Sequence, residues 1–415
     1  MMFPSHRILN LVTVFPVFSI VFLFLSFSAN AQTWEKPYPG NDPTTLYYPD
    51  QNAVYFRYGW ENKGTGILII KGQLPKARYY SYNLYDDRTK GSLVALADYE
   101  IKADGQNNGA YTIYVVPEKL KGDFPNQIVL PDSVRFTSVF LRYYLPEGGI
   151  LAGVPTPTLE WKEGETTRPA PPGIAIPTKN SSEAKALEQL IRSDPNRITN
   201  DERELLASST ATPQQKERII CKVMTVPIFK HVADPQVLSA FNYNSSGNYP
   251  NKDNHYIVMP VNLKKNNVLV VRWKAPTYAT QQGDTSKEVR YYSLSQGNEY
   301  TNTSITLHDE QLRVSEDGFV YVAVAEDDQE IRSRVKDMNI NFMPLLYKER
   351  IVLILRHMLP SSDFRNSARE VPAFDNKRPA SGQEAQKTMG DYALVGKFIK
   401  SSDWKSLTRV DQLGF

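Results

Sequence analysis

The chain has 415 residues but only one cysteine, Cys221. A single cysteine excludes an internal disulfide, so the apolar core must hold the fold together without one. Cys221 follows two isoleucines in a segment that is predicted to be helical. That context favours a buried structural thiol over a reactive nucleophile.

Sequence motifs for metal, cofactor and nucleophile sites are also missing. No histidines or cysteines have the spacing of a metal site. The five histidines are His6, His231, His255, His308 and His357. There is no glycine-rich phosphate loop, and Ser81 and Ser293 lack the G-x-S-x-G turn that exposes a catalytic hydroxyl. We therefore predict no metal, no cofactor and no catalytic residue.

Positive charge is neither strong nor clustered. The chain has 48 Lys and Arg residues against 45 Asp and Glu residues, so its formal net charge is +3. Because no Lys/Arg block could follow a phosphate backbone, we predict that the protein does not bind nucleic acid. The 24 tyrosines suit β-strands and half-exposed surfaces, because the ring packs while the hydroxyl stays solvated.

The N-terminal segment has the pattern of an export signal. Arg7 precedes an apolar run over 8–27, and Ala29-Asn30-Ala31 fits the small-x-small rule for signal peptidase. We expect cleavage before Gln32 and a secreted or periplasmic protein without a stable membrane anchor. The alternative is an uncleaved anchor helix, because about 20 apolar residues can just span a bilayer. Glycosylation sequons begin at Asn180, Asn244 and Asn302.

The chain also repeats itself. Three sequence blocks recur in the same order at offsets of 201, 212 and 214 residues. The matched blocks are 67–71 with 268–272, 78–81 with 290–293, and 140–146 with 354–360. This period is far longer than that of a solenoid unit, so each copy is predicted to be a domain.

Short strand-like runs, separated by Gly, Asn and Pro turns, occur in both copies. The predicted strands are 53–58, 66–71, 78–85, 111–116 and 134–145, and then 256–263, 268–273, 289–294, 319–325 and 350–359. Such a pattern favours an antiparallel sandwich or barrel. The predicted fold class is therefore mainly β, with two tandem, diverged β-sandwich or jelly-roll-like domains and a short helical insert between them.

The repeat and the local composition divide the chain into six segments. They are a signal peptide (1–31), a first β domain with an irregular lead-in (32–161), a Pro-rich linker or strap (162–180), a helical insert (181–249), a second β domain (250–362) and a C-terminal tail that docks on the body (363–415). Convincing helical patterns occur only within 181–223. There, Thr212-Pro213 followed by Gln215 predicts a capping box at a helix start.

The first repeat resembles an exported bacterial family that is catalogued only as a domain of unknown function. That family pairs a W-S-x-x-x-Y-D strand with D-G-x-x-x-I-Y and R-x-Y-x-P strands. The matching residues are Tyr80-Ser81 with Tyr85-Asp86, Asn108-Gly109 with Ile113-Tyr114, and Arg142, Tyr144 and Pro146. Tyr80 replaces the Trp and Asn108 replaces the Asp. The resemblance covers about 100 residues, implies a β-sandwich-like fold and transfers no catalytic residue.

Four arginines occupy matched positions in the two copies. Arg142 and Arg356 lie inside apolar strands, where a buried guanidinium needs a partner. We predict that both are structural and that each ties a strand to its own domain, for example Arg142 to Asp86 or to a loop carbonyl. Arg78 and Arg290 open equivalent strands beside tyrosines. The competing hypothesis is that Arg78, Tyr80, Arg290 and Tyr292 line a cleft for an anionic or carbohydrate ligand.

Two function classes remain open. The favoured one is a non-enzymatic, exported binding or interaction module. The alternative is a secreted or periplasmic hydrolase, for example one acting on carbohydrate, with a site between the two repeats. A glycosidase needs two carboxylates near one bond. The candidate acids are Asp86, Asp87, Asp104, Asp309, Glu316 and Asp317. His308, Asp309 and Glu310 are adjacent, but side chains of an extended chain alternate between faces, so we do not expect them to converge.

Overall fold

The computed structural model describes residues 34–105, 109–150, 154–174, 188–230, 238, 240–242, 249–264, 266–347, 350–373 and 383–415. From Thr33 onwards the chain forms one compact unit. The predicted signal peptide, its cleavage point before Gln32 and the sequons at Asn180 and Asn244 lie outside the described residues. Among the residues that are described, no helix is long and apolar enough to span a membrane.

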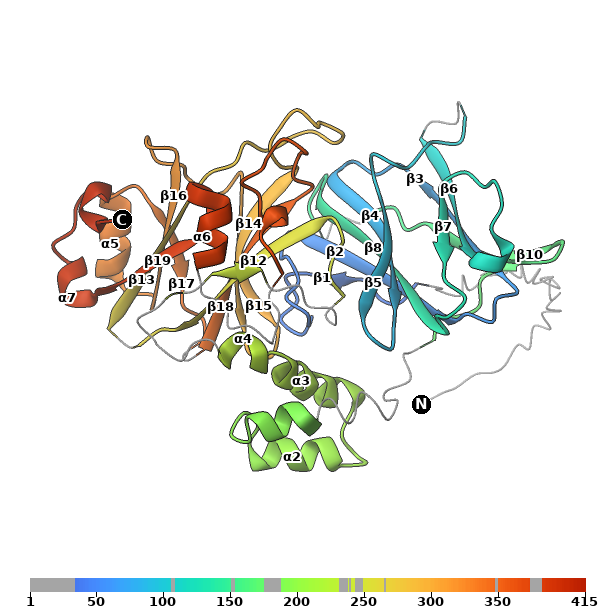
Figure 1. The fold of residues 1–415 in the computed structure, drawn as a ribbon, viewed down its shortest axis with the longest axis horizontal. Helices are drawn as coiled ribbons and strands as arrows, with labels where there is room; N and C mark the ends of the chain where they lie inside the picture. The colour runs from blue at the N-terminus through green and yellow to red at the C-terminus, as the bar shows by residue number, and fades with distance from the viewer. Residues whose placement is uncertain are drawn as a thin grey trace, which may run out of the picture. The chain divides into compact units, whose positions relative to one another are not determined.

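The first half of the chain, residues 34–174, forms two five-stranded sheets (Figure 1). One has the strand order β1 (Tyr38–Pro39), β2 (Ala53–Glu61), β8 (Phe136–Pro146), β4 (Ala77–Asp86) and β5 (Gly91–Ala97). The other has the order β10 (Thr166–Pro169), β9 (Thr158–Glu163), β3 (Ile67–Gln73), β6 (Ala110–Pro117) and β7 (Gln127–Leu130). Neighbours are antiparallel except β6 and β7, which are parallel and joined through the 3-10 helix η1 (Glu118–Leu120).

The second half, residues 249–415, together with the strand before it, repeats this arrangement. Its first sheet has the order β11 (Phe241–Asn242), β12 (Asn254–Asn262), β18 (Arg350–Met358), β14 (Tyr291–Asn298) and β15 (Thr303–His308). Its second has the order β17 (Asn341–Pro344), β16 (Phe319–Ala325), β13 (Asn267–Lys274) and β19 (Val395–Lys400). The parallel pair β16 and β17 is joined through α5 (Gln329–Asp337), where the first half has η1.

The registers of the two halves match at the repeated blocks. Ser81 of β4 pairs with Arg142 of β8, and Ser293 of β14 pairs with Arg356 of β18. The mainly β fold with two tandem, diverged sandwiches is thus confirmed. We call the sheet that holds these strands the seam sheet of each half, because its outer face contacts the other half.

The repeated apolar run has both faces buried. Leu269 and Val271 of β13 point between the two sheets of the second half, into its main core. Val268 and Val270 point outward, and α5 and the C-terminal segment cover them. Because side chains alternate along a strand, a continuous apolar run indicates such a doubly covered strand. Figure 1 shows α5 and α7 (Ser401–Trp404) beside this sheet.

Helices between the halves are α2 (Asn200–Ala207), α3 (Pro213–Met224) and α4 (Val226–Lys230). The predicted capping box of Thr212 with Gln215 at the start of α3 is confirmed. Cys221 is buried in α3, and burial raises the pKa of its thiol to about 12. The thiolate that reacts with electrophiles is therefore strongly disfavoured at neutral pH.

Several elements differ from the sequence predictions. Residues 158–163 and 166–169 form β9 and β10 at the edge of a sheet, where a Pro-rich linker was expected from residue 162. The restriction of helices to 181–223 is wrong, because α5 and α6 (Gln383–Met389) lie beyond it. Helix α5 buries only Ile331 and Val335, so its apolar stripe is too short to stand out. Short 3-10 turns complete the fold: η2 (Ala368–Glu370), η3 (Gly390–Tyr392) and η4 (Val410–Leu413).

Candidate functional site at the seam between the halves

The two seam sheets meet through an apolar cluster that draws residues from both halves. Its buried members are Ala53, Tyr55, Tyr79, Ala97, Tyr144, Tyr291 and Met358. Tyr144 of the first half and Tyr291 of the second pack edge to face, with ring centroids 5.5 Å apart. The repeated tyrosines therefore supply the contact between the sandwiches as well as their cores.

Two buried ion pairs cross this seam in opposite directions. Arg78 of the first half donates to both carboxylate oxygens of Asp309, at 2.8 and 2.9 Å. Arg290 of the second half donates to Asp98 of the first, at 2.8 Å. All four side chains are at most 4 % exposed. Each guanidinium is thus neutralised by a carboxylate of the other half.

The two acids occupy equivalent positions. The backbone N–H of Asp98 donates to the carbonyl of Tyr80, and that of Asp309 donates to the carbonyl of Tyr292. Sequence reasoning missed Asp98, although a signal was present. Asp98 and Asp309 are 211 residues apart, close to the offset of 212 residues between Arg78 and Arg290.

In each half, a short segment between the first and second strands lies on the other half. The first arm, residues 47–52, contacts the second half: the Tyr48 N–H donates to the carbonyl of Thr301 at 2.6 Å. Asp50 in this arm accepts hydrogen bonds from the Tyr291 and Ser293 hydroxyls, each at 2.9 Å. Gln51 donates to the Ser304 carbonyl at 2.8 Å.

The second arm, residues 249–254, makes the reciprocal contacts with the first half. The Tyr249 N–H donates to the carbonyl of Lys90 at 3.0 Å. The N–H of Lys252 donates to the side chain of Asn83 at 3.1 Å, and Asp253 accepts a hydrogen bond from Tyr79. The dipeptides Tyr48-Pro49 and Tyr249-Pro250 repeat at the offset of 201 residues, a signal that could have identified both arms.

Arg142 and Arg356 hold these arms in place. Arg142 donates to the carbonyl of Tyr249 at 2.9 Å, and Arg356 donates to the carbonyl of Tyr48 at 2.7 Å. Both tyrosines adopt left-handed backbone angles, with φ of 49° and 51°. The structure thus differs from the expectation that each arginine ties a strand to its own domain. The carbonyl partner comes from the other half, because the arms are exchanged.

The surroundings of these two arginines are not identical. Arg356 lies 3.7 Å from the carboxylate of Asp50. Position 251, which corresponds to Asp50, is an asparagine, so Arg142 has no matching carboxylate. Instead the rings of Tyr85 and Phe140 each lie 5.3 Å from its guanidinium carbon. Aromatic faces attract a cation, so they replace part of the missing ion pair.

The four residues predicted to line a ligand cleft do not share one cleft, although Arg290 donates to the carbonyl of Arg78 at 3.3 Å. Tyr80 lies in the core of the first sandwich and Tyr292 in that of the second, and both are fully buried. Arg78 and Arg290 lie at the seam and engage Asp309 and Asp98. The side chains at 80 and 292 point between the sheets of their own sandwiches, whereas the arginines are drawn to acids of the opposite half.

His308, Asp309 and Glu310 do converge, contrary to expectation. Their potential metal-binding atoms all lie within 4.8 Å of one another. They can do so because β15 ends at His308 and the chain then turns. Asp309 and Glu310 bind the guanidinium of Arg78, at 2.8 and 2.9 Å, and His308 lies 3.4 Å from Asp309.

The other candidate acids do not gather with these groups, although Asp87 accepts a hydrogen bond from Tyr249 of the second arm at 3.3 Å. Asp87 is buried and accepts hydrogen bonds from Arg57 at 2.8 Å and Ser138 at 2.6 Å, and its burial raises its pKa. Asp86 contacts Arg88, and Glu316 is exposed. Asp104 accepts a hydrogen bond from Thr112, and Asp317 accepts one from Tyr321. Asp104 and Asp317 are held by neighbours on their own sandwich.

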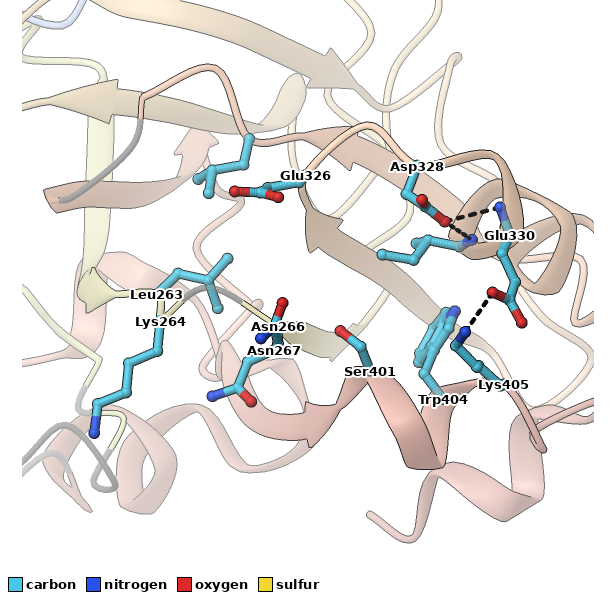
Figure 2. Close-up of a pocket in the computed structure, with 12 residues that line it drawn as sticks. Leu263, Lys264, Asn266, Asn267, Glu326, Asp328, Glu330, Ser401, Trp404 and Lys405 are labelled. Atoms are coloured by element: carbon cyan, nitrogen blue, oxygen red, sulfur yellow. Dashed lines mark hydrogen bonds and ion pairs between the residues drawn. The ribbon is translucent and has the colours of Figure 1, made fainter.

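A hollow of about 400 Å³ lies on the second half, away from these groups (Figure 2). The turn before β13, the loop before α5 and the helix α7 line it. Asp328 caps α5, and Glu330 pairs with Lys405 at 2.7 Å. Glu326, Asn266 and the Ser401 hydroxyl also line the hollow, and their side chains make no hydrogen bond to another described residue. The buried indole N–H of Trp404 also has no partner among the described residues.

Comparison with known proteins gives likeness of fold only. No family model matches the chain, and no curated protein shows significant sequence similarity. An uncharacterised protein from Burkholderia cenocepacia has a similar structure, with a TM-score of 0.53 and 10% identity, over 89% of this chain and 82% of that one. The VPA0106 protein from Vibrio parahaemolyticus gives a TM-score of 0.42 and 11% identity, over 85% of this chain and 90% of that one. The Burkholderia protein shares the fold and, as its description says, is uncharacterised.

Proposed function

We propose that the chain is an exported, non-enzymatic binding or interaction protein. The observation that carries this proposal is the internal pairing of the charged groups that could have performed chemistry. Arg78 neutralises Asp309 and Glu310, and Arg290 neutralises Asp98. Carboxylate oxygens that are already engaged by a guanidinium are not available to contact a substrate.

The alternative is a hydrolase with a site between the repeats. Its best support is the gathering of His308, Asp309 and Glu310 at the seam. A glycosidase mechanism needs one protonated carboxyl group and a second carboxylate with access to the substrate. Asp309 is fully buried and Arg78 engages both of its carboxylate oxygens, so the carboxylate is closed to a substrate.

The hollow on the second half is the surface that we propose for ligand contact. Ligand sites combine a concave shape with a few convergent polar groups. The side chains of Glu326 and Asn266 make no hydrogen bond to another described residue and can contact a ligand. The lining carries three acids, Glu326, Asp328 and Glu330, against the two lysines Lys264 and Lys405, and Glu330 pairs with Lys405. The charges nearly balance, which favours a neutral, hydroxyl-rich ligand such as a carbohydrate.

Binding of a panel of neutral oligosaccharides, measured by isothermal titration calorimetry, tests this proposal. For an oligosaccharide that binds, we expect Glu326→Gln to weaken the affinity about tenfold, because a charge-assisted hydrogen bond is lost. Glu316→Gln, at an exposed acid outside the hollow, is the matched control and should bind like the wild type. Equal affinity of Glu326→Gln and the control, or no binding by any sugar, would argue against this surface. Turnover of chromogenic glycosides or esters would favour the hydrolase.

Export is part of the same proposal and has its own test. We expect the protein purified from the extracytoplasmic fraction to begin at Gln32, because signal peptidase cleaves after a small-x-small sequence. Mass spectrometry of the N-terminal peptide checks this. An intact Met1 in the membrane fraction would mean that the apolar run is retained as an anchor.

A further inference from the structure

The contacts across the seam come in pairs that are related by exchanging the halves. Arg78 binds Asp309 while the equivalent Arg290 binds Asp98, the counterpart of Asp309. Arg142 binds the carbonyl of Tyr249, and the equivalent Arg356 binds that of Tyr48.

The tyrosine contacts follow the same rule. Tyr79 of the first half contacts Asn251 and Asp253 in the second arm, and the equivalent Tyr291 contacts their counterparts Asp50 and Asn52 in the first arm. Both arms thus dock on the same region of the opposite sheet. Reciprocity of this kind, in which residue i contacts j and j contacts i, is the property of a two-fold dimer interface.

Ordinary contacts between unlike domains have no reason to be reciprocal. Here the reciprocity extends over two ion pairs, two arginine–carbonyl bonds and two tyrosine–arm contacts. We propose that the seam is a two-fold dimer interface within one chain, and that each half is a complete binding partner for the other. The partner surface fits a second copy of this sandwich with its arm.

The interface also contains groups that select the correct partner. A sandwich without an acid at the position of Asp98 or Asp309 would leave a buried arginine unpaired, which strongly disfavours binding. Pairing of two second halves would place Arg356 against Asn251, where it now meets Asp50. The loss of this carboxylate favours pairing of a first half with a second half over pairing of two second halves.

Cutting the folded, full-length protein between the halves tests the proposal. A site-specific protease sequence is inserted between Ile174 and Glu188, and the folded protein is then cleaved. We expect both fragments to elute together at the mass of the uncut protein on gel filtration, and to separate only in denaturant. Separation of the fragments in native buffer would overturn the proposal.

Charge reversal in the cut protein tests which contacts hold the halves together. We expect Arg290→Asp to raise the dissociation constant of the two fragments more than tenfold, because it places two carboxylates together in a buried site. Adding Asp98→Arg should restore most of the affinity by reversing the pair. The matched control is Arg332→Asp, which disrupts the exposed ion pair between Arg332 on α5 and Asp327 in the preceding loop. It should have no effect. Equal affinities of Arg290→Asp and Arg332→Asp, or no recovery in the double variant, would contradict the assigned interface.

Discussion

Replacing Arg356 with alanine is expected to lower the free energy of unfolding by roughly 3–5 kcal/mol, because removal of one member of a buried charge pair leaves the other uncompensated. Asp50 is fully buried 3.7 Å from this guanidinium. The substitution also removes the hydrogen bond to the Tyr48 carbonyl and thereby loosens the first arm. Chemical denaturation monitored by circular dichroism measures the change.

Two further variants make this prediction specific. Arg142→Ala removes the equivalent arm contact, but it leaves no matching carboxylate unpaired. Its loss of stability should therefore be smaller than that of Arg356→Ala. Arg332→Ala, in an exposed ion pair, should leave the stability close to that of the wild type, because such pairs contribute little. If Arg356→Ala unfolds like the wild type while binding of a ligand is lost, Arg356 is a site residue and its structural role is wrong.

The two sandwiches could be predicted from the sequence, but the contacts between them at the seam could not. The blocks at 67–71 and 268–272 are apolar runs with a nearby proline, a local pattern that indicates a buried strand and its end. Strand β5 was missed because Gly91–Ala97 is mostly half-buried and begins with small residues, which gives it no alternation. The edge strand β15, at the equivalent position of the second half, was also missed; it is short and has only two apolar residues, Ile305 and Leu307.

The seam was harder to predict because its partners are far apart in the sequence. Arg78 and Asp309 are separated by 231 residues, and no local pattern connects them. The first arm is rich in Tyr, Pro and Asp and was interpreted as an irregular lead-in, since such a composition favours turns. The dipeptide Tyr48-Pro49 of the first arm recurs as Tyr249-Pro250 in the second arm, at the same offset as the first strand block. This recurrence indicates that the two arms have equivalent positions in the fold. An arginine inside an apolar strand predicts a buried partner but not which half supplies it.

The stability of the protein is expected to fall as the pH is lowered from about 6.5 to 4, because of a buried histidine in the second half. His357 of β18 pairs with His255 of β12 and is fully buried. Its Nδ1 accepts a hydrogen bond from the Ala368 N–H at 3.2 Å, which fits a neutral ring. Burial lowers the pKa of His357 to about 3 and that of His255 to about 4.

The sign follows from proton binding in the two states. Unfolded histidine titrates near pH 6.5, so between pH 6.5 and 4 the unfolded chain binds the proton and the folded chain does not. Protonation therefore favours unfolding, and His357 alone is expected to remove about 3 kcal/mol of stability over this range. Burial raises the pKa values of Asp87, Asp98 and Asp253, so these carboxyls act in the opposite direction. Comparing the pH dependence of stability in the wild type with that in a histidine variant is therefore more informative than a titration of the wild type alone.

We expect His357→Gln to flatten the loss of stability between pH 7 and pH 4.5 relative to the wild type. Glutamine can still accept the hydrogen bond from Ala368 through its amide oxygen, but it binds no proton in this range. Its stability at pH 7 should fall, because the amide fills the ring's space poorly against Phe364, so the measured quantity is the difference between the two pH values. Denaturant titrations of both proteins at each pH provide it. An equal loss in the two proteins would mean that folding does not lower the pKa of His357, and the acid sensitivity would then have to come from His255 beside Arg369 and Glu370.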